Sequence, residues 1–215
     1  MNKKGRYSYI IDYFSKHNPD AQSELQYKNA YELLVAVILS AQCTDKRVNL
    51  TTPYFFKQYP TAAQLAEAEV KDIYQIIKSI SYPNNKAKHL QAMAKALMHD
   101  FNGIVPDTIE DLQKLSGVGR KTANVVASVV FNKPAMPVDT HVFRVAARIG
   151  LSTNAKTPLE TEKQLTQNIP QTLISKAHHW LILHGRYVCT ARQPLCHQCG
   201  ISDACKYYQN NKNTN

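Results

Sequence analysis

The strongest chemical signal in the sequence is a group of four cysteines, which lie between positions 189 and 205. One pair of nearby thiols would be a weak signal, but four in so short a segment of a reduced protein indicate metal or cluster ligation. Zinc is the general expectation for four cysteine ligands, and an iron–sulfur cluster accepts the same set, so both remain open. The predicted ligands are Cys189, Cys196, Cys199 and Cys205.

Cys43 and His197 could also act as metal ligands, but we expect neither to do so. Cys43 lies far from the group, at the end of an apolar segment, which is typical of a small buried side chain. His197 lies inside the cysteine segment, yet four thiolates already complete the coordination.

A second signal is the turn Ser116-Gly117-Val118-Gly119, which precedes an apolar-periodic segment that begins near Arg120. Two glycines one residue apart allow a tight turn and let another surface approach the backbone closely. The N–H groups and the dipole at the start of the following helix favour an anion. Residues 112–131 contain no acid. We therefore predict that residues 117–120 grip DNA phosphates, although an ordinary helical hairpin has the same spacing.

Lys121 stands at the start of the second hairpin helix. A lysine there could simply contact a phosphate. A neutral lysine amine is also a strong nucleophile, and attack on a sugar C1′ would give a Schiff base that permits strand cleavage by elimination. The charged neighbour Arg120, the helix dipole and partial burial would each lower the pKa of the amine and favour its neutral form.

Asp139 precedes an apolar-periodic segment that starts with Thr140 and His141. An aspartate in this place is a good N-cap, and a cap also fixes the position of its carboxylate. That carboxylate could stabilise positive charge developing at C1′ or help to deprotonate the lysine. His141 is a candidate contact to the DNA, although a histidine at a helix start is more often structural.

The composition restricts the class of protein. Lys and Arg outnumber Asp and Glu by 26 to 16, a net charge of +10, which favours a polyanionic partner such as nucleic acid or, second, an anionic membrane. No apolar run approaches the ~20 residues that span a bilayer, and the basic N-terminal segment is followed by residues too polar for a secretory signal. We expect a cytoplasmic, nucleoid-associated monomer.

Apolar residues recur at helical spacing along most of the chain, and no strand, repeat or linker is evident. The expected helices cover residues 7–16, 31–41, 46–59, 70–79, 86–101, 139–149, 158–169 and 172–185, besides those of the hairpin. The segment 31–41 is apolar enough to be buried on most of its circumference. Thr44 or Asp45 is expected to cap the helix that follows, and Thr61 is a further expected cap. Lys86, Lys88 and Lys95 are expected to form an exposed basic face. The sequence predicts an all-α protein.

The hairpin, Lys121, the segment that contains Asp139 and the cysteine spacing together resemble those of the bacterial endonuclease III family of DNA glycosylase/AP lyases. The resemblance runs from about residue 24 to Cys205 and includes the segments 39–42, 119–126 and 178–187. It implies a 4Fe-4S cluster in place of zinc, Lys121 as the nucleophile and Asp139 as the essential carboxylate. It also implies two helical lobes with DNA across the cleft between them. A six-helix domain (22–132) would carry the helix-hairpin-helix, and a discontinuous cluster domain would combine residues 1–21 and 133–215.

Enzymes that act on a base must take it out of the stack. In the family, a glutamine like Gln42 fills the space that the base leaves, and a side chain near Tyr82 wedges the opposite strand. Three departures affect this picture. The loop around Tyr82 reads Ser-Tyr-Pro where Gly-Leu-Tyr or Gly-Phe-Tyr is usual, and the hairpin begins Ser-Gly where Pro-Gly is common. The first cysteine loop keeps Arg192 as a DNA contact but is otherwise poor in basic residues.

The main functional prediction is an enzyme that excises oxidised pyrimidines from double-stranded DNA and cleaves the abasic site by β-elimination. A monofunctional adenine glycosylase shares the hairpin and cluster. That group lacks the hairpin lysine, carries an acid in the early core helix and has a further C-terminal domain. Here Lys121 is present, and residues 33–43 contain no acid. A non-enzymatic DNA-binding module is disfavoured because both Lys121 and Asp139 are retained.

Overall fold

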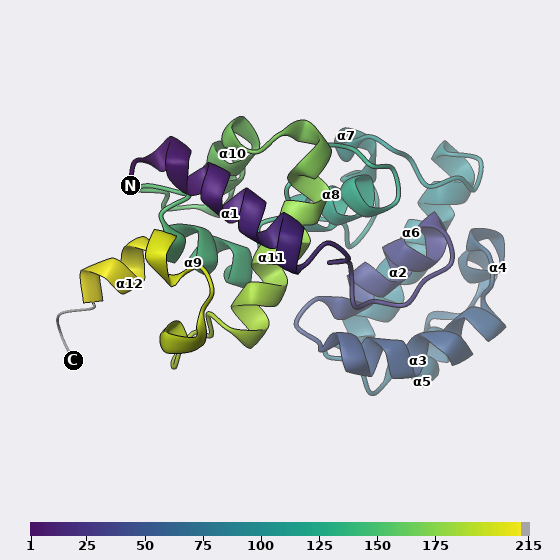
Figure 1. Ribbon diagram of the computed structural model, residues 1–215. Helices are drawn as coiled ribbons and strands as arrows, with labels where there is room; N and C mark the ends of the chain where they lie inside the picture. The colour runs from purple at the N-terminus through teal and green to yellow at the C-terminus, as the bar shows by residue number, and fades with distance from the viewer. Residues whose placement is uncertain (212–215) are drawn as a thin grey trace. The chain divides into compact units, whose positions relative to one another are not determined.

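The structure, a computed structural model, describes residues 1–211, and every regular element within them is helical (Figure 1). The all-α prediction is therefore confirmed. The chain divides into two compact units, one of residues 23–132 and one that combines residues 1–22 with the chain from Lys133 onward. The boundary expected at residue 22 differs from this division by a single residue.

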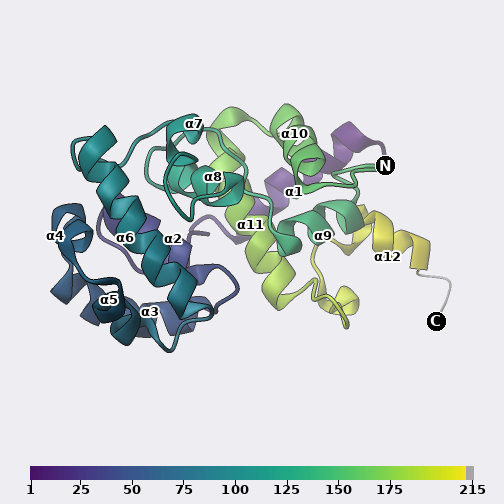
Figure 2. The ribbon, with the colours of Figure 1, turned by 180° about the vertical axis from the view of Figure 1, so that it is seen from behind.

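The unit of residues 23–132 is built around helix α2. Its helices are α2 (Ala30–Ser40), α3 (Asp45–Gln58), α4 (Ala62–Glu67), α5 (Val70–Ile77), α6 (Pro83–Asp100), α7 (Ile109–Leu112) and α8 (Arg120–Val129). These are seven helices, one more than the six that the family resemblance implies. Nine of the eleven residues of α2 are buried, as its apolar sequence predicted. It packs against α3, α6 and α8, and α6 also lies along α4 and α5 (Figure 2).

Polar side chains determine where several of these helices begin. Thr44 and Thr61 accept the N–H of the residue three positions later, so both predicted caps are confirmed. Asn29 and Thr108 cap α2 and α7 in the same way. These caps satisfy N–H groups that have no partner inside the helix.

Helix α6 differs from the prediction at its start. It begins at Pro83, three residues before the expected position, because a proline suits the first position of a helix, where no N–H donor is needed. Lys88 and Lys95 are exposed, as predicted. Lys86 is not part of an exposed basic face: only 6% of it is accessible.

The second unit combines both ends of the chain. Its helices are α1 (Lys3–His17), α9 (Thr140–Ile149), α10 (Pro158–Asn168), α11 (Ile174–Tyr187) and α12 (Lys206–Asn211), with the 3-10 helices η1 (Gln171–Leu173), η2 (Cys196–Gln198) and η3 (Ser202–Ala204). Helix α11 begins two residues later than predicted because η1 precedes it. Helices η2, η3 and α12 were not predicted, since elements this short leave little periodicity in a sequence.

Long-range contacts hold α1 in this unit. Tyr7, Ile10 and Phe14 belong to the same buried apolar cluster as Val142 and Trp180. The indole N–H of Trp180 donates to the carbonyl of Asn18 at 2.8 Å. Figure 1 shows α1 and α12, from opposite ends of the chain, in this unit. In the part of the chain that the structure describes, no helix has the length and apolar content needed to cross a membrane.

The central position of α2 gives a test of the fold. Leu33 has no accessible surface, so Leu33→Ala should cost about 2–5 kcal/mol and lower the thermal midpoint by on the order of 10 °C. Leu50→Ala is the matched control, because Leu50 is 68% exposed, and its midpoint should stay within about 1–2 °C of the parent. Equal midpoints for the two variants, measured by circular dichroism at one heating rate, would contradict the assigned core.

Candidate functional site

The predicted hairpin is present in the first unit. Helix α7 ends at Leu112, a turn follows, and α8 begins at Arg120 with Gly119 as its N-cap. No side chain caps the start of α8, in contrast to α2, α3, α4 and α7. An uncapped helix start combines N–H donors with the positive end of the dipole, which is the arrangement that binds a phosphate.

The two glycines of the turn have different roles. Gly117 has a φ of +79°, and a Cβ there would lie 3.0 Å from the Cβ of His89, so the fold itself requires glycine. A Cβ on Gly119 would meet no heavy atom within 4 Å. The fold therefore leaves open space beside Gly119, where an external backbone could approach. Val118 is buried, and its N–H donates to the carbonyl of Leu115 at 3.1 Å, so this N–H is already used.

The basic residues of the hairpin fall into two groups. Arg120 and Lys121 are exposed in the first turn of α8. The partial burial expected for Lys121 is not found within its unit. Lys114 instead pairs with Asp111 at 2.6 Å, and this ion pair raises the pKa of the lysine and lowers that of the aspartate. Lys121 is thus a stronger candidate than Lys114 for a phosphate contact.

Gln42 and Tyr82 share an unusual backbone conformation in this unit. Their φ angles are +54° and +56°, in the left-handed region that few residues with side chains adopt. Gln42 is exposed directly after α2, and Tyr82 is 63% exposed at the N-cap of α6. Cys43, which follows Gln42, is half-buried, so the prediction of a buried side chain was wrong. Both turns present side chains to solvent.

Asp139 and His141 lie in the second unit, at the start of α9. The Asp139 carboxylate accepts the N–H of Val142 at 2.8 Å, which confirms it as the N-cap. The half-buried His141 ring lies 3.2 Å from the guanidinium of Arg144, which also donates to the carbonyls of Gly185 and Cys189. His141 therefore has a structural role, and its contact with DNA stays a prediction.

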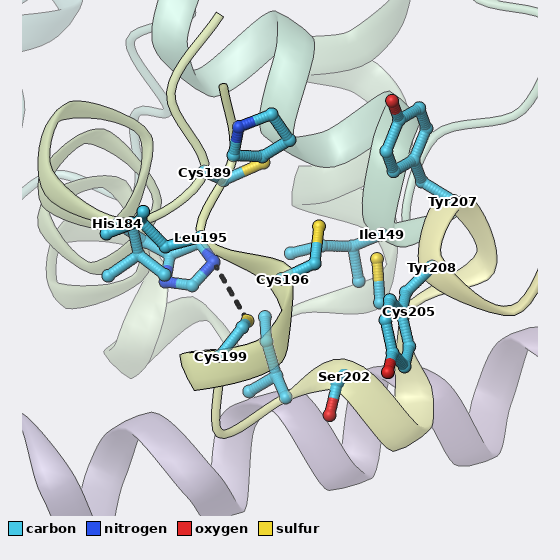
Figure 3. A pocket seen from close by; sticks show the side chains of 13 residues that line it. Ile149, His184, Cys189, Leu195, Cys196, Cys199, Ser202, Cys205, Tyr207 and Tyr208 are labelled. Carbon is cyan, nitrogen blue, oxygen red and sulfur yellow. Dashed lines mark hydrogen bonds between the residues drawn. The ribbon is translucent and has the colours of Figure 1, made fainter. Parts of the chain in front are cut away.

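The four predicted cysteine ligands line one pocket. Figure 3 shows their sulfurs around this space, with His184 on one side and Tyr207 and Tyr208 on the other. The cysteines come from the end of α11, from η2 and from the segments that flank η3. The exposed Arg192 lies in the first cysteine loop.

The donor set fits an iron–sulfur cluster. Burial raises the pKa of the Cys199 and Cys205 thiols, and the neighbouring thiolates raise it further. A polynuclear cation would offset both effects, because it stabilises the thiolate form. Four thiolates also complete a tetrahedral zinc site, so the donor set by itself accepts either group.

Two further residues touch the cysteines, and sequence reasoning missed both. Arg148 of α9 donates to the sulfur of Cys189 at 3.5 Å and to the carbonyl oxygens of Thr190 and Ala191 at 2.7 and 2.8 Å. The His184 ring lies 3.7 Å from the sulfur of Cys199, and burial lowers its pKa to about 4, which keeps it neutral. Arg148 lies 41 residues before Cys189 and His184 lies 15 residues before Cys199, so only tertiary packing reveals these contacts.

Comparison with known proteins defines the class of this fold and site. Residues 35–171 match the sequence model described as the HhH-GPD superfamily of base excision DNA repair proteins, and residues 189–205 match the iron–sulfur binding domain of endonuclease III. Endonuclease III of Rickettsia felis is 50% identical over 93% of each chain. That of Escherichia coli K12 is 41% identical over 96% of this chain and 97% of its own.

The solved structures agree with these relatives. A trapped covalent intermediate of an endonuclease III with DNA has a TM-score of 0.92 and 42% identity, and the match covers 99% of this chain and all of that one. The chain belongs to the endonuclease III family. It is a base excision repair DNA glycosylase/AP lyase with an iron–sulfur cluster, for which the 4Fe-4S form is the family norm.

The two glycines of the hairpin give a matched pair of substitutions. Gly119→Ala should weaken binding to abasic-site duplex DNA by about 10-fold, because the new methyl group meets only the incoming strand. It should change the thermal midpoint by only a few degrees. Gly117→Ala should instead destabilise the fold by more than about 1 kcal/mol, because the left-handed turn and His89 oppose a side chain. Normal DNA binding by Gly119→Ala in a fluorescence-anisotropy titration would exclude the backbone grip.

The pocket predicts the metal content of the protein. The purified parent should be yellow-brown and contain about four iron atoms per chain. Cys196→Ala should lose most of this iron, because one of four ligands is removed, whereas Cys43→Ala should keep it. Iron and inorganic sulfide analysis checks both variants. An active, colourless protein that contains only zinc would overturn the assignment of the pocket.

Proposed function

We propose that this enzyme excises oxidised pyrimidines from double-stranded DNA and then cleaves the abasic site through a lysine Schiff base. Lys121 is the proposed nucleophile and Asp139 the proposed carboxylate. The observation that supports this proposal is the position of Lys121, exposed in the first turn of α8 and directly after the uncapped glycine turn. A strand held by its phosphates at that helix start would present a deoxyribose near the lysine amine.

The proposed chemistry uses one amine in two steps. The neutral Nζ of Lys121 forms a bond to C1′ as the damaged base departs, which gives a positively charged Schiff base after ring opening. Transfer of a C2′ proton to water then breaks the C3′–O bond and expels the 3′ phosphate by β-elimination, and hydrolysis of the remaining imine by water frees Lys121. Asp139 would accept a proton from the lysine or stabilise the charge at C1′. Its cap bond to Val142 fixes one carboxylate oxygen and leaves the carboxylate only half buried.

Other residues are proposed to position the DNA. Gly117, Gly119 and Arg120 would hold the strand, and the exposed Arg192 would contact a phosphate near the cluster. Val118 is a weaker candidate, because its side chain is buried and its N–H already donates to the carbonyl of Leu115. Gln42 would fill the space of the extruded base, and Tyr82 would enter the opposite strand. The exposed, left-handed turns of Gln42 and Tyr82 support the roles proposed for these two residues. His141 is retained as a weaker candidate, because its known partner is Arg144.

The proposal assigns a different task to each unit. Residues 23–132 would carry the hairpin and the two turns, and the discontinuous unit would hold the cluster through its four cysteines. The cluster would fix the loop of Arg192, since all four cysteine ligands come from the C-terminal segment. We propose a monomer that acts on the cytoplasmic, nucleoid-associated DNA of a bacterium, because one chain carries every residue named here.

Borohydride trapping tests the proposed lysine chemistry. The parent should form a covalent adduct with duplexes that contain thymine glycol or an abasic site, and Lys121→Ala should form none. Asp139→Asn should lower the single-turnover rate by about 100-fold or more and retain the thermal midpoint, because asparagine is an equally good N-cap. Base release without trapping by the parent would favour a monofunctional glycosylase. Trapping by Lys121→Ala at the parent rate would exclude the assigned nucleophile.

A further inference from the structure

Lys86 is a buried lysine that the proposed mechanism does not use. It lies in the first turn of α6, and only 6% of it is accessible. Its Nζ donates to the carbonyl of Leu39 at 2.7 Å and to that of Ala41 at 2.7 Å. Among the ion pairs formed by the described residues, none includes Lys86. The charge is therefore held by backbone carbonyls and not by a carboxylate.

The two carbonyls belong to the end of α2. The last carbonyls of a helix lack partners inside it and carry the negative end of the dipole, so a cation there is stabilising. Burial lowers the pKa of Lys86, while the nearby Cys43 sulfur acts in the opposite direction. Retention of the buried charge therefore depends on these carbonyl contacts. They fix the backbone at the residue immediately before Gln42.

The same lysine also contacts the second exposed turn. Its backbone N–H donates to the carbonyl of Tyr82 at 3.1 Å, the first hydrogen bond of α6. Gln42 and Tyr82 both have positive φ angles, and strained residues of this kind persist only where their surroundings determine them strongly. Lys86 thus joins the two turns, through its side chain to one and through its backbone to the other.

We propose that Lys86 is a positioning residue that holds Gln42 and Tyr82 in the arrangement required to enter the duplex as a base is extruded. This inference rests on the proposed roles of those two residues. Lys86 touches neither the reacting sugar nor Lys121 in this scheme. Its loss should therefore impair reactions that need extrusion from a duplex and spare the lysine chemistry on a strand that has no partner.

The test compares two substrates in each variant. Single-turnover trapping is measured on a thymine glycol duplex and on a single strand with an abasic site, which requires no extrusion. Lys86→Met should slow the duplex reaction by about 100-fold, the effect expected of a small misplacement, and the single-strand reaction by less than about 3-fold. The matched control is Lys95→Met, which removes an exposed charge from the same helix and should leave the ratio of the two rates unchanged.

The outcomes separate this inference from the proposed function. If the parent traps on neither substrate, the lysine mechanism fails. If the parent traps on both substrates and Lys86→Met lowers the two rates by the same factor, Lys86 has no positioning role. The same conclusion follows if Lys86→Met lowers neither rate. If Lys95→Met lowered the two rates as much as Lys86→Met does, the positioning role of Lys86 would also be excluded, because the loss of a positive charge would explain the effect in both variants.

A second measurement applies even where Lys86→Met does not fold. Lys86→Arg retains the charge but changes the reach to the two carbonyls, so it should slow the duplex reaction when Gln42 is present. In the Gln42→Ala background the same change should have a much smaller effect, because residues that act through one another are not additive. Full additivity of the two substitutions would overturn the proposal.

Discussion

The burial of α2 is the constraint on which the first unit depends. Nearly every side of this helix is covered, so neither its axis nor its rotation can change without loss of core contacts. Ile38 lies under the hairpin, where a side chain on Gly117 would come within 3.6 Å of it. The end of the same helix leads directly into the turn of Gln42. One apolar segment therefore supports both the proposed phosphate grip and the proposed inserting residue.

The second unit uses a different kind of constraint. Its cysteine segment has only short 3-10 helices and cannot bury much surface by itself, so it depends on its neighbours. Arg148 holds the carbonyls of the first cysteine loop, and His184 packs against Cys199. These contacts help to gather the thiols around one space. The fold thereby places four cysteine ligands together, and a cation between them would stabilise their thiolate form.

Much of this architecture was evident in the sequence, and the exceptions have physical causes. Long helices, the buried α2, the Asp139 cap and the cysteine group follow from periodicity and spacing, which are local properties. The burial of Lys86 was missed because lysines at helical spacing usually form an exposed face, and the carbonyls that bind it lie more than forty residues earlier. The predicted start of α6 was three residues too late, because the Ser-Tyr-Pro stretch that ends at Pro83 has the composition of a loop. Arg148 and His184 were missed for the same reason as Lys86: their partners are distant in sequence.

The discontinuous unit has a consequence for synthesis on the ribosome. The hydroxyl of Tyr7 donates to the carbonyl of Leu151, and the guanidinium of Arg6 to that of Ala204, a partner 198 residues later. Helix α1 therefore emerges first but reaches its native neighbours only when the last segment is made. Residues 23–132 can assemble in the interval, since domains generally fold as units while the chain grows. Until then the apolar face of α1, which includes Tyr7, Ile10 and Phe14, lacks its native partners.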